Sequence, residues 1–347
     1  MAGTWNNQNK ILPGAYINFL TNAPLSITPG ERGTVLLLLE VSVGTAGDIY
    51  TVTALENDFP AGVTAKDTFL AGQACKGAQT VKVYNLGSTH DGAAVQAALE
   101  AIKTVDFDVL VYPYDGTDFN SNKAVIADFI SGMVNSEGKG IQGVLANHKG
   151  DFEGIINVTQ GVKLTDGTIL TAAETTPWVA GITAGANINR SNTGKKYQGA
   201  IDVVPRKTKA EMEAAITNGE FIFKVDSAQN VTAAYDINSL TTLTEAKGKP
   251  FTKNRVIRTL YGINNDITEI FESNYVGQLN NNQDGRSLLR ATLVEYFNEL
   301  QRLDAIKDFT ADDVTISQGS DSDAVVVDCY VKPVDSVEKM YITVKLS

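Results

Sequence analysis

The chain has 347 residues, of which 43% are hydrophobic and 20% charged, a composition typical of a globular protein with a full core and long enough for two domains. Lysine and arginine together number 29, and aspartate and glutamate number 40, so the formal net charge is −11 at pH 7. This acidic balance argues against nucleic acid and anionic membrane surfaces as partners, because phosphate groups are bound by basic faces.

Membrane insertion and secretion are not indicated either. The longest apolar run, residues 34–41, contains Glu40 and is far shorter than the roughly 20 residues of a membrane-spanning helix. The first ten residues lack the charged and apolar regions of a signal peptide. The two cysteines, Cys75 and Cys329, provide no disulfide framework, which favours a reducing compartment. We therefore expect a protein that is made in the cytoplasm.

In chain order, the first predicted elements are strands that alternate with helices. LPGAYINFL, residues 12–20, follows a polar start and predicts a short strand. Four later segments are rich in β-branched residues and are bounded by turn residues, which predicts buried strands at 34–41, 80–86, 107–114 and 141–147.

Two amphipathic helices are predicted between these strands, over residues 91–104 and 120–136. The expected apolar faces consist of Val95, Leu99 and Ile102 in the first helix and Val125, Phe129 and Met133 in the second. Alternation of strands and helices predicts an α/β layer with parallel strand pairing.

The character of the sequence changes after residue 175. We predict a helix over 175–185, a short helix over 207–220 that Gly219 ends, and a hairpin formed by residues 221–227 and 231–237. A polar connection over 236–254 leads to two long helices, 254–277 and 286–306, and a β-rich segment follows at 312–334. The expected core residues of the two long helices are Val256, Leu260, Ile263, Ile267 and Phe271, and Leu289, Leu293, Phe297, Leu300 and Leu303.

The last segment, VEKMYITVKLS over residues 337–347, has the alternation of a half-buried strand. Met340, Ile342, Val344 and Leu346 are expected on one face, and the side chains between them on the other. No neighbouring segment is an obvious partner for this strand.

Two motifs suggest binding sites but lack the context that such sites need. GKGIQG, residues 138–143, has dinucleotide-binding spacing, but a helix precedes it and a strand follows, so we predict a loop that enters a strand. NNNQDG, residues 280–285, lacks the first aspartate and the final glutamate of a calcium loop, so we predict a turn that caps the next helix, with Asp284 in its first turn.

Catalytic candidates are few. His90 and His148 are the only histidines, which excludes a site with three or more histidine ligands, and His90 is expected at the surface or at a helix cap. A carboxylate pair of Asp106 or Asp108 with Asp115 remains open. Cys329 is expected to be an inert core residue. We therefore predict no catalytic, cofactor-binding or metal-binding residues.

Several segments resemble the tail sheath proteins of contractile phage tails and phage-tail-like bacteriocins, above all the short sheaths of Gram-positive prophages and tailocins. The resemblance is densest in NRVIRTLYGINNDI (254–267), YVGQLNNNQDGRSLLRATLVEYFNELQ (275–301) and DSDAVVVDCYVKPVDSVEKMYITVKL (321–346). LPGAYINF at 12–19 is similar to the N-terminal arm of that family, and TTPWVAGITAG at 175–185 to a central segment.

The resemblance implies a structural subunit that polymerises as stacked hexameric rings around an inner tube and contracts to drive the tube through a target envelope. It implies neighbouring sheath subunits, the tube protein, and baseplate and tail terminator proteins as partners, and no enzyme activity. The particle would be a virion tail or a released bacteriocin, assembled from protein made in the bacterial cytoplasm. The larger sheaths carry outer decorating domains, which we do not expect in this shorter chain.

The resemblance also implies that both arms add strands to neighbouring subunits. The residues expected to do so are Tyr16, Ile17, Phe19, Met340, Ile342, Val344 and Leu346. The expected fold is α/β, or α+β overall, with an N-terminal arm (1–20), an α/β domain (21–238), a C-terminal domain with two long helices and a sheet (239–334) and a C-terminal arm (335–347).

A basic stretch without acidic residues, 247–258, suggests a contact with an acidic inner tube. We expect Lys253, Arg255 and Arg258 to face the tube, and a solvated basic loop with a helix start is the other interpretation. Two other functions remain open for the chain: a soluble α/β enzyme with a non-standard active site and a monomeric ligand-binding module.

Overall fold

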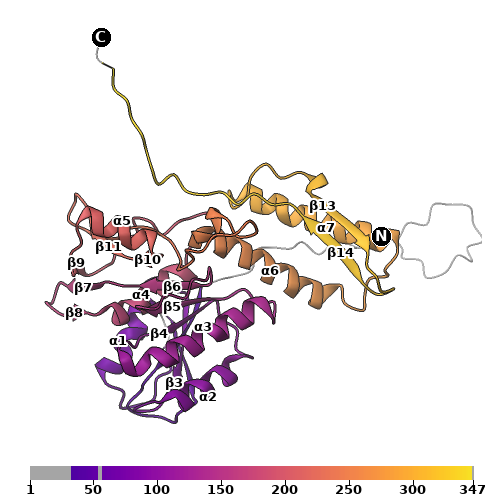
Figure 1. Ribbon diagram of the computed structural model, residues 1–347. Coiled ribbons are helices and arrows are strands. Elements are labelled where there is room, and N and C mark those ends of the chain that lie inside the picture. Colours follow the sequence, from indigo (N-terminus) through magenta and orange to yellow (C-terminus); the bar gives the residue numbers. More distant parts are fainter. Residues whose placement is uncertain (1–32, 54–56, 346–347) are drawn as a thin grey trace, which may run out of the picture.

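A seven-stranded sheet forms the centre of the larger part of the molecule (Figure 1). The computed structural model describes residues 33–53 and 57–345. The strand order is β10-β6-β5-β4-β1-β3-β2, and every neighbouring pair is parallel except β2 with β3. The strands are β1 (Thr34–Leu39), β2 (Ile49–Thr53), β3 (Thr80–Asn85), β4 (Val109–Tyr112), β5 (Gln142–Ala146), β6 (Ile155–Val158) and β10 (Glu220–Phe221). The predicted parallel α/β layer is confirmed.

Helices cover both faces of this sheet. On one face, α2 (Gly92–Ile102) and α3 (Asn120–Asn135) pack over Leu36 and Leu38, and on the other, α1 (Ala65–Ala74) and α4 (Ala172–Ala184) pack over Val35 and Leu37. Successive side chains of a strand point to opposite faces, which is why the apolar run of β1 supplies both cores.

The buried face of α3 differs by one position from the expected face. Ile126, Ile130 and Met133 are buried, whereas Val125 and Phe129 are only partly buried. Both stripes have helical spacing, and only the packing against the sheet selects between them.

Smaller sheets and α5 (Lys209–Thr217) complete this part of the molecule. The predicted hairpin is present as an antiparallel pair, and a second, three-stranded antiparallel sheet lies beside α4. Gly219, at φ +71°, follows α5 as predicted. The strands are β7 (Gly161–Leu164), β8 (Ile169–Leu170), β9 (Ala200–Val204), β11 (Phe223–Val225) and β12 (Val231–Ala233).

Several elements were not indicated by the sequence patterns. They are α1, β2 and β6 to β9. The strands have between 2 and 5 residues, which is too short for a clear period. In α1 the buried residues are small or polar, such as Ala71 and Gln73, so no apolar stripe marks this helix.

The C-terminal part consists of two long helices, as predicted, and of a hairpin within the segment that was predicted to be β-rich. They are α6 (Asn254–Asn274), α7 (Gln283–Arg302), β13 (Val314–Gln318) and β14 (Val325–Cys329), and β13 and β14 are antiparallel. Short 3-10 helices occur at Thr117–Phe119, Lys249–Thr252 and Ala311–Asp313. Helix α6 leads from the seven-stranded sheet to α7 and the hairpin (Figure 1).

Helix α6 contacts both parts of the molecule. Near its middle, Asn265 accepts a hydrogen bond from the backbone of Gly140 and donates one back, at 2.8 and 2.9 Å. A Cβ at Gly140 would lie 2.6 Å from Tyr261, so only glycine allows this close packing. Further along, Ile263 and Ile267 pack with α7. Because one helix belongs to both parts, the domain boundaries proposed from the sequence stay predictions.

The expected core of the two helices is confirmed more fully for α7 than for α6. Leu289, Leu293, Phe297 and Leu300 are buried. Of the α6 residues, Val256 is buried and Leu260, Ile263 and Ile267 are half-buried, whereas Phe271 is 38% exposed.

Both sequence motifs have the predicted conformations. Gly138, at φ +68°, lies between α3 and β5, so the glycine-rich segment enters a strand. Asn282 caps α7 by accepting a hydrogen bond from the backbone of Gly285, and Asp284 lies in the first turn.

Candidate functional site: the C-terminal arm and its anchor

The chain leaves β14 and runs back beside the segment that follows α7. Ile306 and Pro333 form an antiparallel bridge. The backbone N–H of Lys307 donates to Lys332 at 3.0 Å, and that of Val334 donates to Ala305 at 2.9 Å. These contacts bring residues 335–338 to the start of α6.

Glu338 is then held in a buried polar cluster. Its side chain is 7% exposed, and its carboxylate accepts hydrogen bonds from the hydroxyls of Thr193, at 2.6 Å, and Ser191, at 3.0 Å. It also pairs with the ammonium of Lys253. A buried carboxylate is tolerated only when it is paired and hydrogen-bonded in this way.

Lys253, the residue that precedes α6, completes the cluster. Its ammonium lies 3.8 Å from the ring centre of Tyr235 and 3.9 Å from Asp335. Burial raises the pKa of Glu338, but the hydrogen bonds from Lys253 and Thr193 outweigh burial, so that pKa lies below its ordinary value. Burial lowers the pKa of Lys253, and the bond to Glu338 more than restores it. Both side chains are therefore charged at neutral pH.

The N-terminal end of α6 adds two arginines to this region. Arg255 donates to the hydroxyl of Ser336 at 2.8 Å and to the backbone carbonyl of Asp304 at 3.1 Å. Arg258 donates to the fully buried carboxylate of Asp236 at 3.2 Å. The Glu338 cluster with the Arg255 contacts is called the anchor below.

The burial of these basic residues corrects an expectation. Lys253, Arg255 and Arg258 are 7%, 5% and 8% exposed, whereas side chains that face an inner tube must be exposed. Folding brings two carboxylates of the same chain to the basic stretch: Glu338 pairs with Lys253, and Asp236 pairs with Arg258. The structure places all three side chains inside the protomer.

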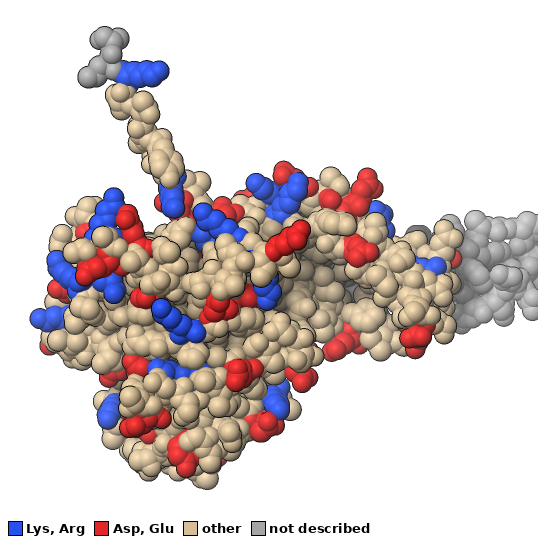
Figure 2. Space-filling model, in the orientation of Figure 1, with Lys and Arg blue, Asp and Glu red and all other residues tan. Residues whose placement is uncertain are grey.

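Beyond the anchor, residues 339–345 form neither a helix nor a strand and stand clear of the molecule (Figures 1 and 2). Met340, Ile342 and Val344 are 77%, 73% and 77% exposed. Within the part of the chain that the structure describes, the predicted strand has no partner. Leu346 and the expected N-terminal arm residues Tyr16, Ile17 and Phe19 lie outside the described residues.

The β13–β14 hairpin is a candidate partner for such a strand. No third strand joins it among residues 33–53 and 57–345. Val326 and Val327 of β14 are 47% and 38% exposed. An apolar groove of about 310 Å³ beside it is lined by α6, α7 and β14, including Phe271 and Leu293. Exposed apolar side chains on an open sheet edge are typical of a surface that another segment covers.

The expected surface or capping role of His90 is wrong. Its side chain is fully buried at the carboxyl end of the sheet, with Nδ1 2.8 Å from Glu40 and Nε2 2.6 Å from the hydroxyl of Tyr112. The helix cap is the neighbouring Asp91. Each ring nitrogen therefore has one polar partner, and Asn122 also donates a hydrogen bond to the Tyr112 hydroxyl.

Replacing His90 with alanine is expected to lower the free energy of unfolding by about 1–3 kcal/mol, because the buried Tyr112 hydroxyl loses a hydrogen-bond partner. His148→Ala is the matched control, since its half-buried ring lies outside this cluster. Urea denaturation of both variants measures the difference. Equal stability of His90→Ala and the parent would contradict the assigned contacts.

The proposed carboxylate pair does not form. Asp108 precedes β4 and accepts hydrogen bonds from the backbone of Gly33 and Thr34 at 2.9 Å. Asp115 follows β4 and pairs with Lys123 at 2.6 Å. The two carboxylates therefore lie at opposite ends of the strand.

Among the described residues, no group of three or more histidine, cysteine, aspartate or glutamate side chains is placed to hold a metal ion. No described helix combines the length and the apolar character needed to cross a membrane.

Comparison with known proteins identifies the family. Residues 88–239 match the phage tail sheath protein central domain, and residues 246–347 match the phage tail sheath C-terminal domain. The chain belongs to the phage tail sheath family. The protein YqbK of Bacillus subtilis strain 168 is 40% identical over 266 residues, which is 74% of this chain. That stretch is 57% of the relative, so the chain spans little more than half its length.

Solved sheath structures have the same fold. The sheath tail protein of Desulfitobacterium hafniense is 33% identical, with a TM-score of 0.83 over 96% of this chain and 100% of that one. The helical sheath of the anti-feeding prophage in its contracted state is 15% identical, with a TM-score of 0.74 over 97% of this chain and 100% of that one. The second likeness concerns the fold alone. As expected for this family, the sheath fold here combines an α/β sheet domain with two long helices and a small sheet.

Proposed function

We propose that this chain is the structural subunit of a contractile tail sheath in a phage or a phage-tail-like bacteriocin. It polymerises as stacked hexameric rings around an inner tube and contracts to drive the tube through a target envelope. The observation that carries this proposal is the C-terminal arm, which is anchored at its root and exposes apolar side chains at alternate positions. Family membership supports the same function.

In this proposal the arm of one protomer adds a strand to the β13–β14 sheet of a neighbour. The alternation of Met340, Ile342 and Val344 matches the period of a strand with one buried face. The edge of β14 that no described strand pairs with offers backbone groups to a new strand, and Val326 and Val327 beside it are exposed. An arm that stayed free would leave both apolar surfaces in water.

The link between two protomers is modest in strength. Each new backbone hydrogen bond contributes about 1 kcal/mol, and each fully buried aliphatic side chain about 1.5–3 kcal/mol. Ordering the arm costs about 1–2 kcal/mol per residue in backbone entropy. A single link is therefore weak, and many repeated links hold a polymer together while its subunits rotate during contraction.

The partners are neighbouring copies of this chain, an inner tube protein, and baseplate and tail terminator proteins. Family membership supports these partners. The protein acts mechanically and catalyses no reaction, and its work comes from the contact differences between two packings of the same subunits. It is made in the bacterial cytoplasm and resides in a virion tail or a released particle.

Negative-stain electron microscopy of the purified chain tests the proposal, and we expect tubes or stacked rings. A second measurement identifies the acceptor sheet. Equal amounts of two differently tagged chains, one carrying Val326→Cys and one carrying Ile342→Cys, are oxidised after assembly, with Cys75 and Cys329 replaced by serine. Disulfides between the two tags are expected. Because the alignment of the arm with β14 is not fixed in advance, Met340→Cys and Val344→Cys are tested in the same way as Ile342→Cys.

Only monomers at every concentration would contradict the sheath function and favour the soluble enzyme or the ligand-binding module. Tubes without cross-links at any of the three arm positions would instead contradict β14 as the acceptor.

A further inference from the structure

The anchor has a consequence for which sheet the arm can reach. We propose that Glu338 and Lys253 are positioning residues that prevent the arm from closing on the β13–β14 sheet of its own protomer, so that it stays available to a neighbour. This inference rests on the proposed strand addition to β14. Such an arm can pair with the β13–β14 sheet of its own protomer or with that of a neighbour. In dilute solution its own sheet has the higher effective concentration, because the two belong to one chain.

The geometry of a hairpin shows what the anchor prevents. For Ile342 to lie opposite Val327 in an antiparallel pair, the chain must turn at Val334 and Asp335, halfway between them. Val334 is paired with Ala305 through its backbone, and Asp335 lies 3.9 Å from the Lys253 ammonium. The residues that would form the turn are therefore tied to the segment after α7 and to the start of α6.

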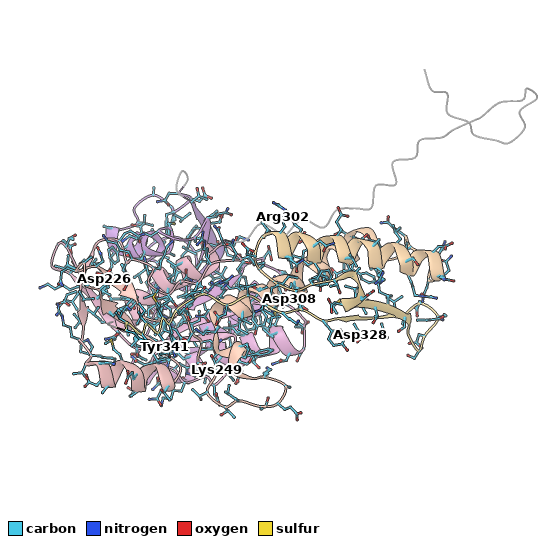
Figure 3. All side chains as sticks on the ribbon, turned by 90° about the horizontal axis from the view of Figure 1, so that it is seen from above. Asp226, Lys249, Arg302, Asp308, Asp328 and Tyr341 are labelled. Atoms are coloured by element: carbon cyan, nitrogen blue, oxygen red, sulfur yellow. The ribbon has the colours of Figure 1, made fainter. Side chains whose placement is uncertain are left out.

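A turn placed beyond the anchor does not bring the arm to its own sheet either. If the chain reversed just after Glu338, residues 340–344 would lie opposite residues 333–337, and β14 would remain out of reach. In both Figure 1 and Figure 3 the arm lies on the side of its root away from β13 and β14, and the labels of Tyr341 and Asp328 are well separated.

The strength of the hold follows from the burial of the cluster. The side chains of Glu338 and Lys253 are 7% and 9% exposed. Thr193 and Ser191 supply two further hydrogen bonds from a loop about 145 residues away in sequence. Removing one charge leaves the other buried without its partner, so residues 335–338 should detach and the turn at 334 and 335 should become accessible.

A double-cysteine chain measures this closure directly. Val327→Cys and Ile342→Cys, which lie opposite each other in this hairpin, are placed in one chain without Cys75 and Cys329, and the protein is oxidised as a monomer, below the concentration at which it assembles. With Glu338 present, we expect an intramolecular disulfide in a small fraction of chains. With Glu338→Gln in the same chain, we expect this fraction to rise at least tenfold.

Assembly supplies the second measurement. Glu338→Gln should raise the protein concentration needed for polymerisation at least tenfold, because closed arms are withdrawn from neighbours. Glu213→Gln is the matched control, since Glu213 forms an exposed ion pair with Lys209 at 3.8 Å and should leave both measurements unchanged. Ser191→Ala removes one hydrogen bond to Glu338 and keeps the ion pair, so it should give a smaller change of the same sign. It replaces Glu338→Gln if that variant does not fold.

Equal closure with and without Glu338, or an unchanged assembly threshold in Glu338→Gln, would overturn the anchor's role. These outcomes differ from failure of the sheath function, which the mixed-chain cross-linking tests with Glu338 intact. A parent chain that forms tubes and mixed cross-links, together with a Glu338→Gln chain that behaves identically, would leave the sheath function standing and remove this inference.

Discussion

A chain that lacks residues 339–347 is expected to remain folded, soluble and monomeric under conditions in which the intact chain forms tubes or rings. The deleted described residues, 339–345, make no strand pairing with the rest of the molecule and are exposed at Met340, Ile342 and Val344. Their removal therefore leaves the cores untouched. Glu338 is retained so that the anchor is not disturbed.

A point substitution sharpens this result. Ile342→Asp should also prevent polymerisation, because strand insertion would bury an unpaired charge. Thr343→Asp is the matched control, since the neighbouring side chain points to the other face of the inserted strand. Size-exclusion chromatography and negative-stain imaging decide the outcome. Tubes of normal length from the truncated chain would show that the arm is not the link between subunits.

Phe297→Ala is expected to lower the free energy of unfolding by about 3–5 kcal/mol, because it opens a cavity in the core between α7 and the hairpin. Phe297 is fully buried, and its ring centre lies 5.4 Å from that of Tyr296 and 5.1 Å from that of Phe309. The loss is large against the stability of a typical domain, so the variant should express poorly or aggregate.

Phe271→Ala is the control for this prediction. Both phenylalanines occupy predicted apolar faces of long helices, but Phe271 is 38% exposed. Its truncation removes less buried surface and should cost clearly less than that of Phe297. Urea denaturation curves of both variants provide the comparison. Equal losses would show that the assigned burial of α7 is incorrect.

The repeating patterns of the sequence were sufficient to predict most of the architecture. β1 and β4 are short and largely apolar, and β3 and β5 each carry valine beside other apolar residues. The buried residues of α2 and α7 recur at helical spacing. These are local properties, because the side-chain period of a strand or helix depends on neighbouring residues alone. The alternating pattern of residues 340–344 was also visible in the sequence, and among residues 33–53 and 57–345 no strand pairs with this segment.

The tertiary structure decided which side chains are buried and which charges meet. Lys253, Arg255 and Arg258 look like a solvated basic stretch until Asp236 and Glu338 are folded against them. Glu338 lies 85 residues from Lys253, and His90 lies 50 residues from Glu40. Contacts over such separations depend on how the sheet and helices pack, and no local period encodes them. For this reason the alternating pattern of residues 340–344 could be recognised in the sequence, whereas the anchor of Glu338 could not, and strand addition by the arm stays a prediction.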